Sequence, residues 1–127
     1  MAVPQHQPIS GPARRRVAVA TQVPPGECCP QLHEAIELIG KRWTGAIVYV
    51  LLHHGRPMRF SEVGQAVPQL SDRLLSERMK ELEARGIVER QVHAESPVRV
   101  EYELTTMGRD LEPALEELRR WALHYMH

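Results

Sequence analysis

The fold is decided by residues 58–104, which read MRFSEVGQAVPQLSDRLLSERMKELEARGIVERQVHAESPVRVEYEL. The first part of this stretch predicts two helices. Ser61 can cap a short helix that Pro68 ends, because proline lacks the amide hydrogen needed to continue it. After a tight turn, Ser71 can cap a longer helix, and Gly86 supplies its stop. Two helices joined by so short a turn indicate a helix-turn-helix motif.

The second part of the stretch predicts a β-hairpin. Apolar and polar side chains alternate in residues 98–104, and residues 87–92 contain three β-branched side chains. Such runs are typical of strands with one buried face. Residues 93–97 form the polar loop between them, and residues 58–60 form a short extended link ahead of the first helix. A hairpin that directly follows a helix-turn-helix is a wing, so we expect a mainly α fold with a small β-hairpin, the winged helix-turn-helix.

Three further helices are predicted around this motif. Residues 30–39 begin with proline, show apolar side chains at helical spacing and are followed by glycine. Residues 43–54 are apolar on nearly all sides, which predicts a helix buried in the core. A final long helix begins at Thr105 or Thr106, since either hydroxyl can cap it.

The final helix carries a long apolar stripe. A monomer of this size cannot cover all of it, so the stripe predicts a homodimer that forms through the terminal helices. The helix of residues 31–39 is expected to contribute to the same interface. The predicted interface residues of the final helix are Leu111, Leu115, Leu118, Trp121 and Tyr125.

Length and composition narrow the class of protein. The 127 residues, 43% apolar and 25% charged, suit one globular domain, which we assign to residues 28–127. Residues 1–27 hold five of the ten prolines and little apolar periodicity, which predicts a flexible arm. No apolar run approaches the roughly 18 residues that span a bilayer. The N-terminus also lacks the apolar segment of a secretory signal. We therefore expect a cytoplasmic protein without membrane contact.

Charge is distributed unevenly along the chain, although the formal net charge is zero. Residues 41–100 carry ten basic and seven acidic side chains, whereas residues 101–127 carry three basic and six acidic ones. This polarity suits a protein that presents one face to phosphate and another face to a different partner.

Residues 28–127 resemble the HxlR-type family of winged helix-turn-helix regulators, which is related to the MarR-like regulators. The matching motifs occur in the family's order: Cys29-Pro30, Gly40-Lys41-Arg42-Trp43-Thr44, Arg59-Phe60-Ser61-Glu62, Leu70-Ser71, Glu81-Leu82-Glu83, Gly86-Ile87-Val88, Val100-Glu101-Tyr102 and Leu104-Thr105. The chain departs from the family in its extra Arg42, its long arm and its second cysteine, Cys28. The resemblance implies a homodimeric transcriptional regulator, usually a repressor, that binds double-stranded DNA. Because a two-fold dimer repeats its recognition helix, we expect the operator to be pseudo-palindromic.

The helix after Ser71 is the expected recognition helix. In this fold the second helix of the motif lies in the major groove, where its N-terminal half and outward face meet base edges. The predicted contacts in this helix are Ser71, Asp72, Arg73, Ser76, Glu77 and Lys80. Those in the hairpin are Arg90, His93 and Arg99. Arg73 suits guanine and Lys80 suits phosphate. The same side chains would also suit a solvated helix face.

Cys29 is a candidate sensor. It lies just ahead of a helix N-terminus, whose field favours the reactive thiolate. The resemblance implies that a cysteine at this position responds to oxidants, quinones or other electrophiles. Cys28 is placed by the sequence to react equally well. In the alternative interpretation, the cysteines are small packing residues and the regulator responds to a different small-molecule ligand.

Other functions fit the sequence less well. A winged helix used only for protein contact would bind no DNA. An enzyme with Cys29 as nucleophile would need a histidine and an acid beside the thiol, and the sequence places none there. The neighbouring His53 and His54, and the terminal His124 and His127, lack the arrangement of a metal site. We therefore expect no catalytic activity, no cofactor and no metal.

Overall fold

The computed structural model describes residues 26–127, so nearly all of the arm predicted for residues 1–27 lies outside the described residues. Contacts divide the chain into two compact units, Met1–His33 and Glu34–His127. The boundary falls within helix α1 (Pro30–Ile39), four residues after its start. The elements of the winged helix-turn-helix all belong to the second unit.

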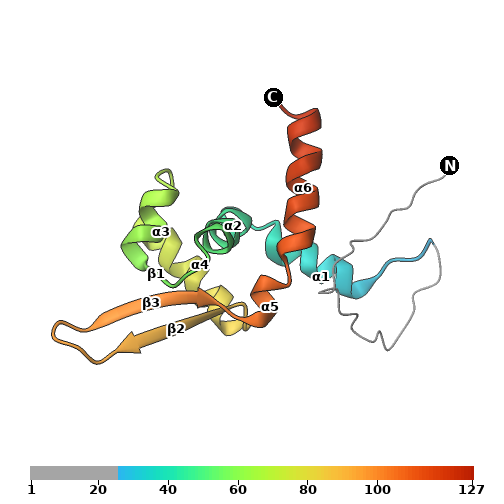
Figure 1. The fold of residues 1–127 in the computed structure, drawn as a ribbon. Coiled ribbons are helices and arrows are strands. Elements are labelled where there is room, and N and C mark those ends of the chain that lie inside the picture. Colours follow the sequence, from blue (N-terminus) through green and yellow to red (C-terminus); the bar gives the residue numbers. More distant parts are fainter. Residues whose placement is uncertain (1–25) are drawn as a thin grey trace. The chain divides into compact units, whose positions relative to one another are not determined.

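The second unit contains the predicted order of helices and strands (Figure 1). After α1 come α2 (Thr44–His54), β1 (Met58–Arg59), α3 (Phe60–Ala66), α4 (Asp72–Ala84), β2 (Val88–His93), β3 (Arg99–Leu104), α5 (Thr106–Arg109) and α6 (Glu112–Tyr125). The β2–β3 hairpin projects beyond the helices as a wing, and α3 and α4 form the helix-turn-helix beside its base. The predicted fold class is confirmed.

The sheet has a third strand in addition to the predicted hairpin. Its order is β1-β3-β2, with both pairs antiparallel. Met58 pairs with Tyr102, and Val88 pairs with Leu104. The link predicted for residues 58–60 is therefore a short strand that joins the base of the wing to the start of α3.

The core forms where α2, α4 and the inner face of the sheet meet. Ile47 and Val48 of α2 are fully buried, as the all-round apolar pattern of this helix predicts. The buried apolar set is Ile47, Val48, Leu51, Met58, Val63, Val67, Leu70, Leu75, Met79, Leu82, Ile87, Val88, Leu104 and Leu115. Because α4 contributes three of these side chains, its position is anchored on one face by apolar packing.

Two helix starts differ from the sequence predictions. Helix α3 begins at Phe60, one residue before the predicted cap, because the Glu62 carboxylate accepts the Arg59 backbone N–H at 2.8 Å. Ser61 is therefore inside the helix. Helix α2 begins at Thr44, and Trp43 precedes it with φ 76°, in the left-handed region.

The predicted final helix is divided into α5 and α6. Thr105 caps α5, since its hydroxyl accepts the Gly108 backbone N–H at 3.2 Å. Helix α6 starts anew at Glu112, with proline in its first turn, where the missing amide hydrogen costs nothing. Glycine is required at position 108, within α5, because a Cβ there would collide with the Ile87 carbonyl oxygen. The break sets the direction in which α6 leaves the wing.

Among the described residues, no helix combines the length and the apolar character needed to cross a membrane.

Candidate nucleic-acid interface

Helix α4 is held at its N-terminus by a side-chain cap. The Ser71 hydroxyl accepts the Leu74 backbone N–H at 3.2 Å, and Ser71 itself is extended. This cap satisfies one of the free amides of the first turn. The Ser71 cap predicted from the sequence is confirmed, and it fixes the start of the helix that follows the turn.

The outward face of α4 is polar and solvent-exposed. Asp72, Arg73, Glu77 and Lys80 are exposed, whereas Ser76 is half-buried. The Arg73 side chain is 89% exposed, and its Nε lies 3.8 Å from a Glu77 carboxylate oxygen. Such an exposed pair contributes little stability, so the guanidinium can leave it at small cost. The Lys80 ammonium makes no ion pair with any residue in the range 26–127. Both cations are thus available to a ligand.

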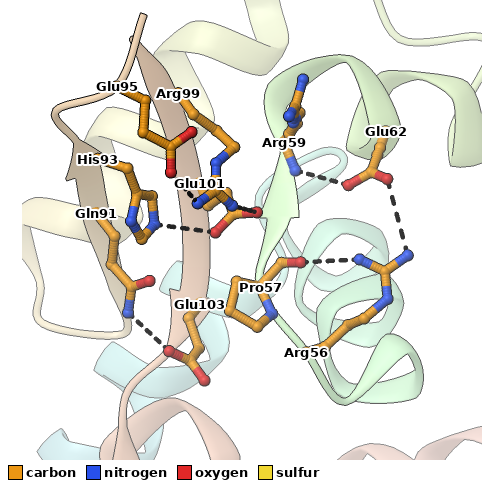
Figure 2. Close-up of polar contacts among 10 residues, drawn as sticks. All are labelled: Arg56, Pro57, Arg59, Glu62, Gln91, His93, Glu95, Arg99, Glu101 and Glu103. Atoms are coloured by element: carbon orange, nitrogen blue, oxygen red, sulfur yellow. Dashed lines mark hydrogen bonds and ion pairs between the residues drawn. The ribbon is translucent and has the colours of Figure 1, made fainter.

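The outer face of the wing carries a network of ion pairs (Figure 2). The Arg99 guanidinium donates to Glu95 at 2.8 Å and to Glu101 at 3.0 Å. His93 Nε2 lies 3.1 Å from the other oxygen of Glu101. The hydrogen bond to Glu95 raises the pKa of Arg99, and the same bond holds the pKa of Glu95 below its usual range. Two of the three predicted wing residues, His93 and Arg99, therefore already contact carboxylates of the chain.

Arg90 lies apart from these two residues. It pairs in register with Tyr102, whereas His93 pairs with Arg99, so strand alternation places Arg90 on the opposite face of the hairpin. Its side chain is exposed and has no ion-pair partner among residues 26–127. The structure also places His93 in strand β2, one residue before the loop, where the sequence analysis had put it in the loop.

Two arginines that the sequence analysis did not select lie beside the wing. Arg59 of β1 is exposed and pairs in register with Glu101 of β3, and its charge helps to lower the pKa of Glu95. An Arg56 Nη donates to the Pro57 carbonyl at 3.0 Å, and the other lies 3.7 Å from Glu62. Arg56 lies two residues before β1 and Arg59 lies within it, and this position in or next to the extended link is the signal that could have identified them.

The apolar residues of α6 divide into two groups. Leu118, Trp121 and Tyr125 are each more than half exposed, so they are available to a partner. Leu115 is instead buried in the core of the same chain, and Leu111 packs partly against that core. The prediction that Leu115 needs a partner for cover was wrong, because the break before α6 turns this residue toward α2.

The sequence analysis missed two exposed apolar side chains at the end of α6, Leu123 and Met126. In α1, which was expected to contribute to the interface, Leu32 and Ile36 are each 59% exposed, and no residue is buried. These side chains increase the apolar area that is uncovered in a single chain.

Cys29 occupies the cap position of α1. Its Sγ accepts the Leu32 backbone N–H at 3.4 Å and lies 3.6 Å from a Gln31 side-chain oxygen. Cys28 is exposed, Cys29 is half-buried, and both thiols are free. Among residues 26–127, no group of histidine, cysteine and carboxylate side chains is arranged to hold a metal.

The sequence matches the model of a known family. Residues 38–127 match the HxlR-like helix-turn-helix family. Among the relatives is YvaP of Bacillus subtilis, an uncharacterized HTH-type transcriptional regulator that is 47% identical over 79% of this chain and 91% of YvaP. Another is the HTH-type transcriptional regulator YodB of the same organism, 46% identical over 74% of this chain and 82% of YodB.

Solved structures of two regulators share the fold. Reduced YodB superposes with a TM-score of 0.71 at 42% identity and covers 80% of this chain and 97% of its own. The redox regulator HypR, in its oxidized form, superposes with a TM-score of 0.70 at 34% identity and covers 78% of this chain and 99% of its own. YodB has also been solved after diamide treatment and with bound quinone.

Proposed function

Because the chain belongs to the HxlR-like helix-turn-helix family of transcriptional regulators, we propose that it binds a pseudo-palindromic DNA operator as a homodimer and represses transcription there. The family resemblance read from the sequence is confirmed. The relatives are regulators, and none of the matches reported above is an enzyme. The proposal concerns the finer steps: DNA recognition by α4, dimerisation through the terminal helices, and control by a thiol.

The observation that carries the proposal is the division of α4 into a buried and an exposed face. Leu75, Met79 and Leu82 fix one face in the core, while the outward face presents Arg73 and Lys80 without strong partners. A helix whose inner face is fixed in the core and whose outer face carries cations has the geometry of a recognition helix in a major groove. The ion-paired wing contributes less positive charge than the sequence analysis assumed.

The test is the salt dependence of binding to a selected operator. Genomic fragments bound by the protein are enriched and sequenced, and the affinity for the best fragment is measured from low to physiological salt. Each phosphate contact is expected to contribute about −0.9 to the slope of log K against log salt concentration. A scrambled fragment is the control and should bind far more weakly. A module used only for protein contact would show neither the enrichment nor the slope.

We further propose that Cys29 makes DNA binding responsive to oxidants and electrophiles. The thiol lies at the cap position of α1, where its sulfur accepts the Leu32 backbone N–H at 3.4 Å. The similarity to YodB, which has been solved with bound quinone, supports this chemistry. A group added to the sulfur would compete with the Leu32 amide and disturb the start of a helix that we place in the dimer interface.

The thiol hypothesis predicts different responses from two single variants. After treatment with a quinone or with diamide, the parent and Cys28→Ser should lose operator affinity on the order of tenfold, a typical size for coupling between two sites. Cys29→Ser should keep its affinity. Electrophoretic mobility shifts before and after treatment measure this, with alkylation rates of both variants as a control for thiol access. A Cys29→Ser protein that responds as the parent does would assign sensing to Cys28 or to a different ligand.

A further inference from the structure

Helix α4 has a third face that neither the core nor the proposed DNA contact uses. Arg78 and Glu81 lie along it, and Arg85, the residue that follows the helix, continues the same helical spacing. All three make polar contacts to residues 34–42, which include the second half of α1 and the junction between α1 and α2. We call this set of contacts the α4 seam.

Arg78 is the central residue of the α4 seam. Its Nε donates to the Arg42 carbonyl at 2.9 Å, and its Nη1 lies 3.4 Å from a Glu81 carboxylate oxygen. The Arg78 side chain is only 11% exposed. A largely buried guanidinium that donates to a carbonyl and a carboxylate fixes the relative orientation of the two segments that it joins, because its planar fork allows little rotation.

The carbonyl that Arg78 binds belongs to a tightly constrained junction. The next residue, Trp43, has φ 76°, a conformation that bulky side chains rarely adopt. The Arg42 guanidinium lies 5.3 Å from the centre of the Trp43 ring. At Gly40, a Cβ would come within 2.7 Å of the Ile36 carbonyl oxygen. Such backbone strain persists only where surrounding contacts hold it, and the Arg78 bond is one of them.

Two ion pairs extend the α4 seam on either side. Lys41 Nζ lies 2.8 Å from Glu81, and the hydrogen bond lowers the pKa of that carboxyl group. Arg85 lies 2.7 Å from Glu34 of α1. Between these pairs lies an open groove of about 370 Å³ whose lining includes Leu38. Leu38 and Ile39 also pack partly against the core, so the polar contacts act together with this packing to set the position of residues 34–41 relative to α4.

The geometry points to Arg78 and Glu81 as positioning residues for operator binding, although neither touches DNA. The α4 seam fixes the angle of the recognition helix, α4, relative to residues 34–43. In a two-fold dimer that angle sets the separation of the two recognition helices, which has to match the spacing of the half-sites. A displacement of α1 reaches α4 through these contacts. This inference rests on the proposed DNA binding and adds the path by which it is controlled.

The test compares Arg78→Met and Glu81→Gln with Arg109→Met. Arg109 also donates to a backbone carbonyl, that of Leu104, but it lies in α5 and outside the α4 seam. Each protein is titrated with the operator, with a scrambled duplex, and with operators whose half-sites are moved by one base pair either way. Thermal unfolding is followed in parallel, so that lost stability is separated from lost positioning.

The two α4-seam variants should lose on the order of tenfold in operator affinity and most of their preference for the natural spacing, with unchanged affinity for the scrambled duplex. Arg109→Met should keep the spacing preference even if it melts earlier. If Arg78→Met does not fold, Glu81→Gln carries the test. An unaltered spacing preference in the folded α4-seam variants overturns the inference. A parent protein that does not distinguish operator from scrambled DNA instead overturns the proposed function.

Discussion

The Leu118→Asp variant is expected to be monomeric and to bind the operator at least about 100-fold more weakly than the parent, because two linked half-site contacts become independent. Leu118 is 56% exposed on α6, between Trp121 on one side and the core-facing Leu115 on the other. Each two-fold interface contains this residue twice, so two carboxylates would have to be buried without partners.

Analytical ultracentrifugation and operator titration measure the two effects. The matched control is Arg120→Asp, which introduces the same side chain on the opposite side of α6, where Arg120 pairs with Glu117 in solvent. That variant should remain dimeric and bind DNA. The interface is wrong if Leu118→Asp sediments as the parent does. The need for a dimer is wrong if the monomer binds with parental affinity.

The Arg73→Ala variant is expected to relax the base preference of the operator and to cost about 1–3 kcal/mol in operator binding, the value of a bidentate contact to guanine. Arg73 is suited to this role because its side chain is 89% exposed near the start of α4 and only loosely paired with Glu77. Lys80 lies two turns further along the same outward face and suits phosphate.

A panel of operators with single base changes, titrated at one salt concentration, measures the preference. For Arg73→Ala, one position of the operator should lose its discrimination while the others keep theirs. For Lys80→Ala, all sequences should weaken alike, and the salt slope should fall by about 1. If Arg73→Ala keeps the parental preference at every position, a different side chain reads the bases.

The sequence was sufficient to predict the helices and strands whose signals are local. The Ser71 cap, the Gly86 stop and the alternation in residues 98–104 each act within a few residues, and all three correspond to the structure. The competing cap of α3 was harder to predict, because a Glu62 side chain that reaches back to Arg59 outcompetes the Ser61 hydroxyl.

Features that depend on distant residues were not predicted. The apolar pattern continues across the break between α5 and α6, so the pattern does not reveal the break. Proline does not disturb the pattern, because it is tolerated in the first turn of the new helix. Leu115 was therefore assigned to the wrong surface. The contact of His93 with Glu101 joins two different strands, and the contact of Arg78 with Arg42 joins residues 36 positions apart. Charge counts along the chain contain no information on such pairs.

The ion pairs of the wing have a consequence for selectivity. Arg99 already binds two carboxylates, so a DNA phosphate at this predicted contact would compete with anions of the chain itself. Glu101 is only 16% exposed and is held on two sides, whereas the Glu95 side chain is 53% exposed and sits in the loop. Under the proposed DNA binding, a phosphate would have to exchange with Glu95 before Arg99 could bind it. The exchange would lower the free energy gained on any random duplex, and a genome consists mostly of such duplexes. The wing would thereby leave discrimination to α4 and shorten the time that the protein spends on non-specific DNA.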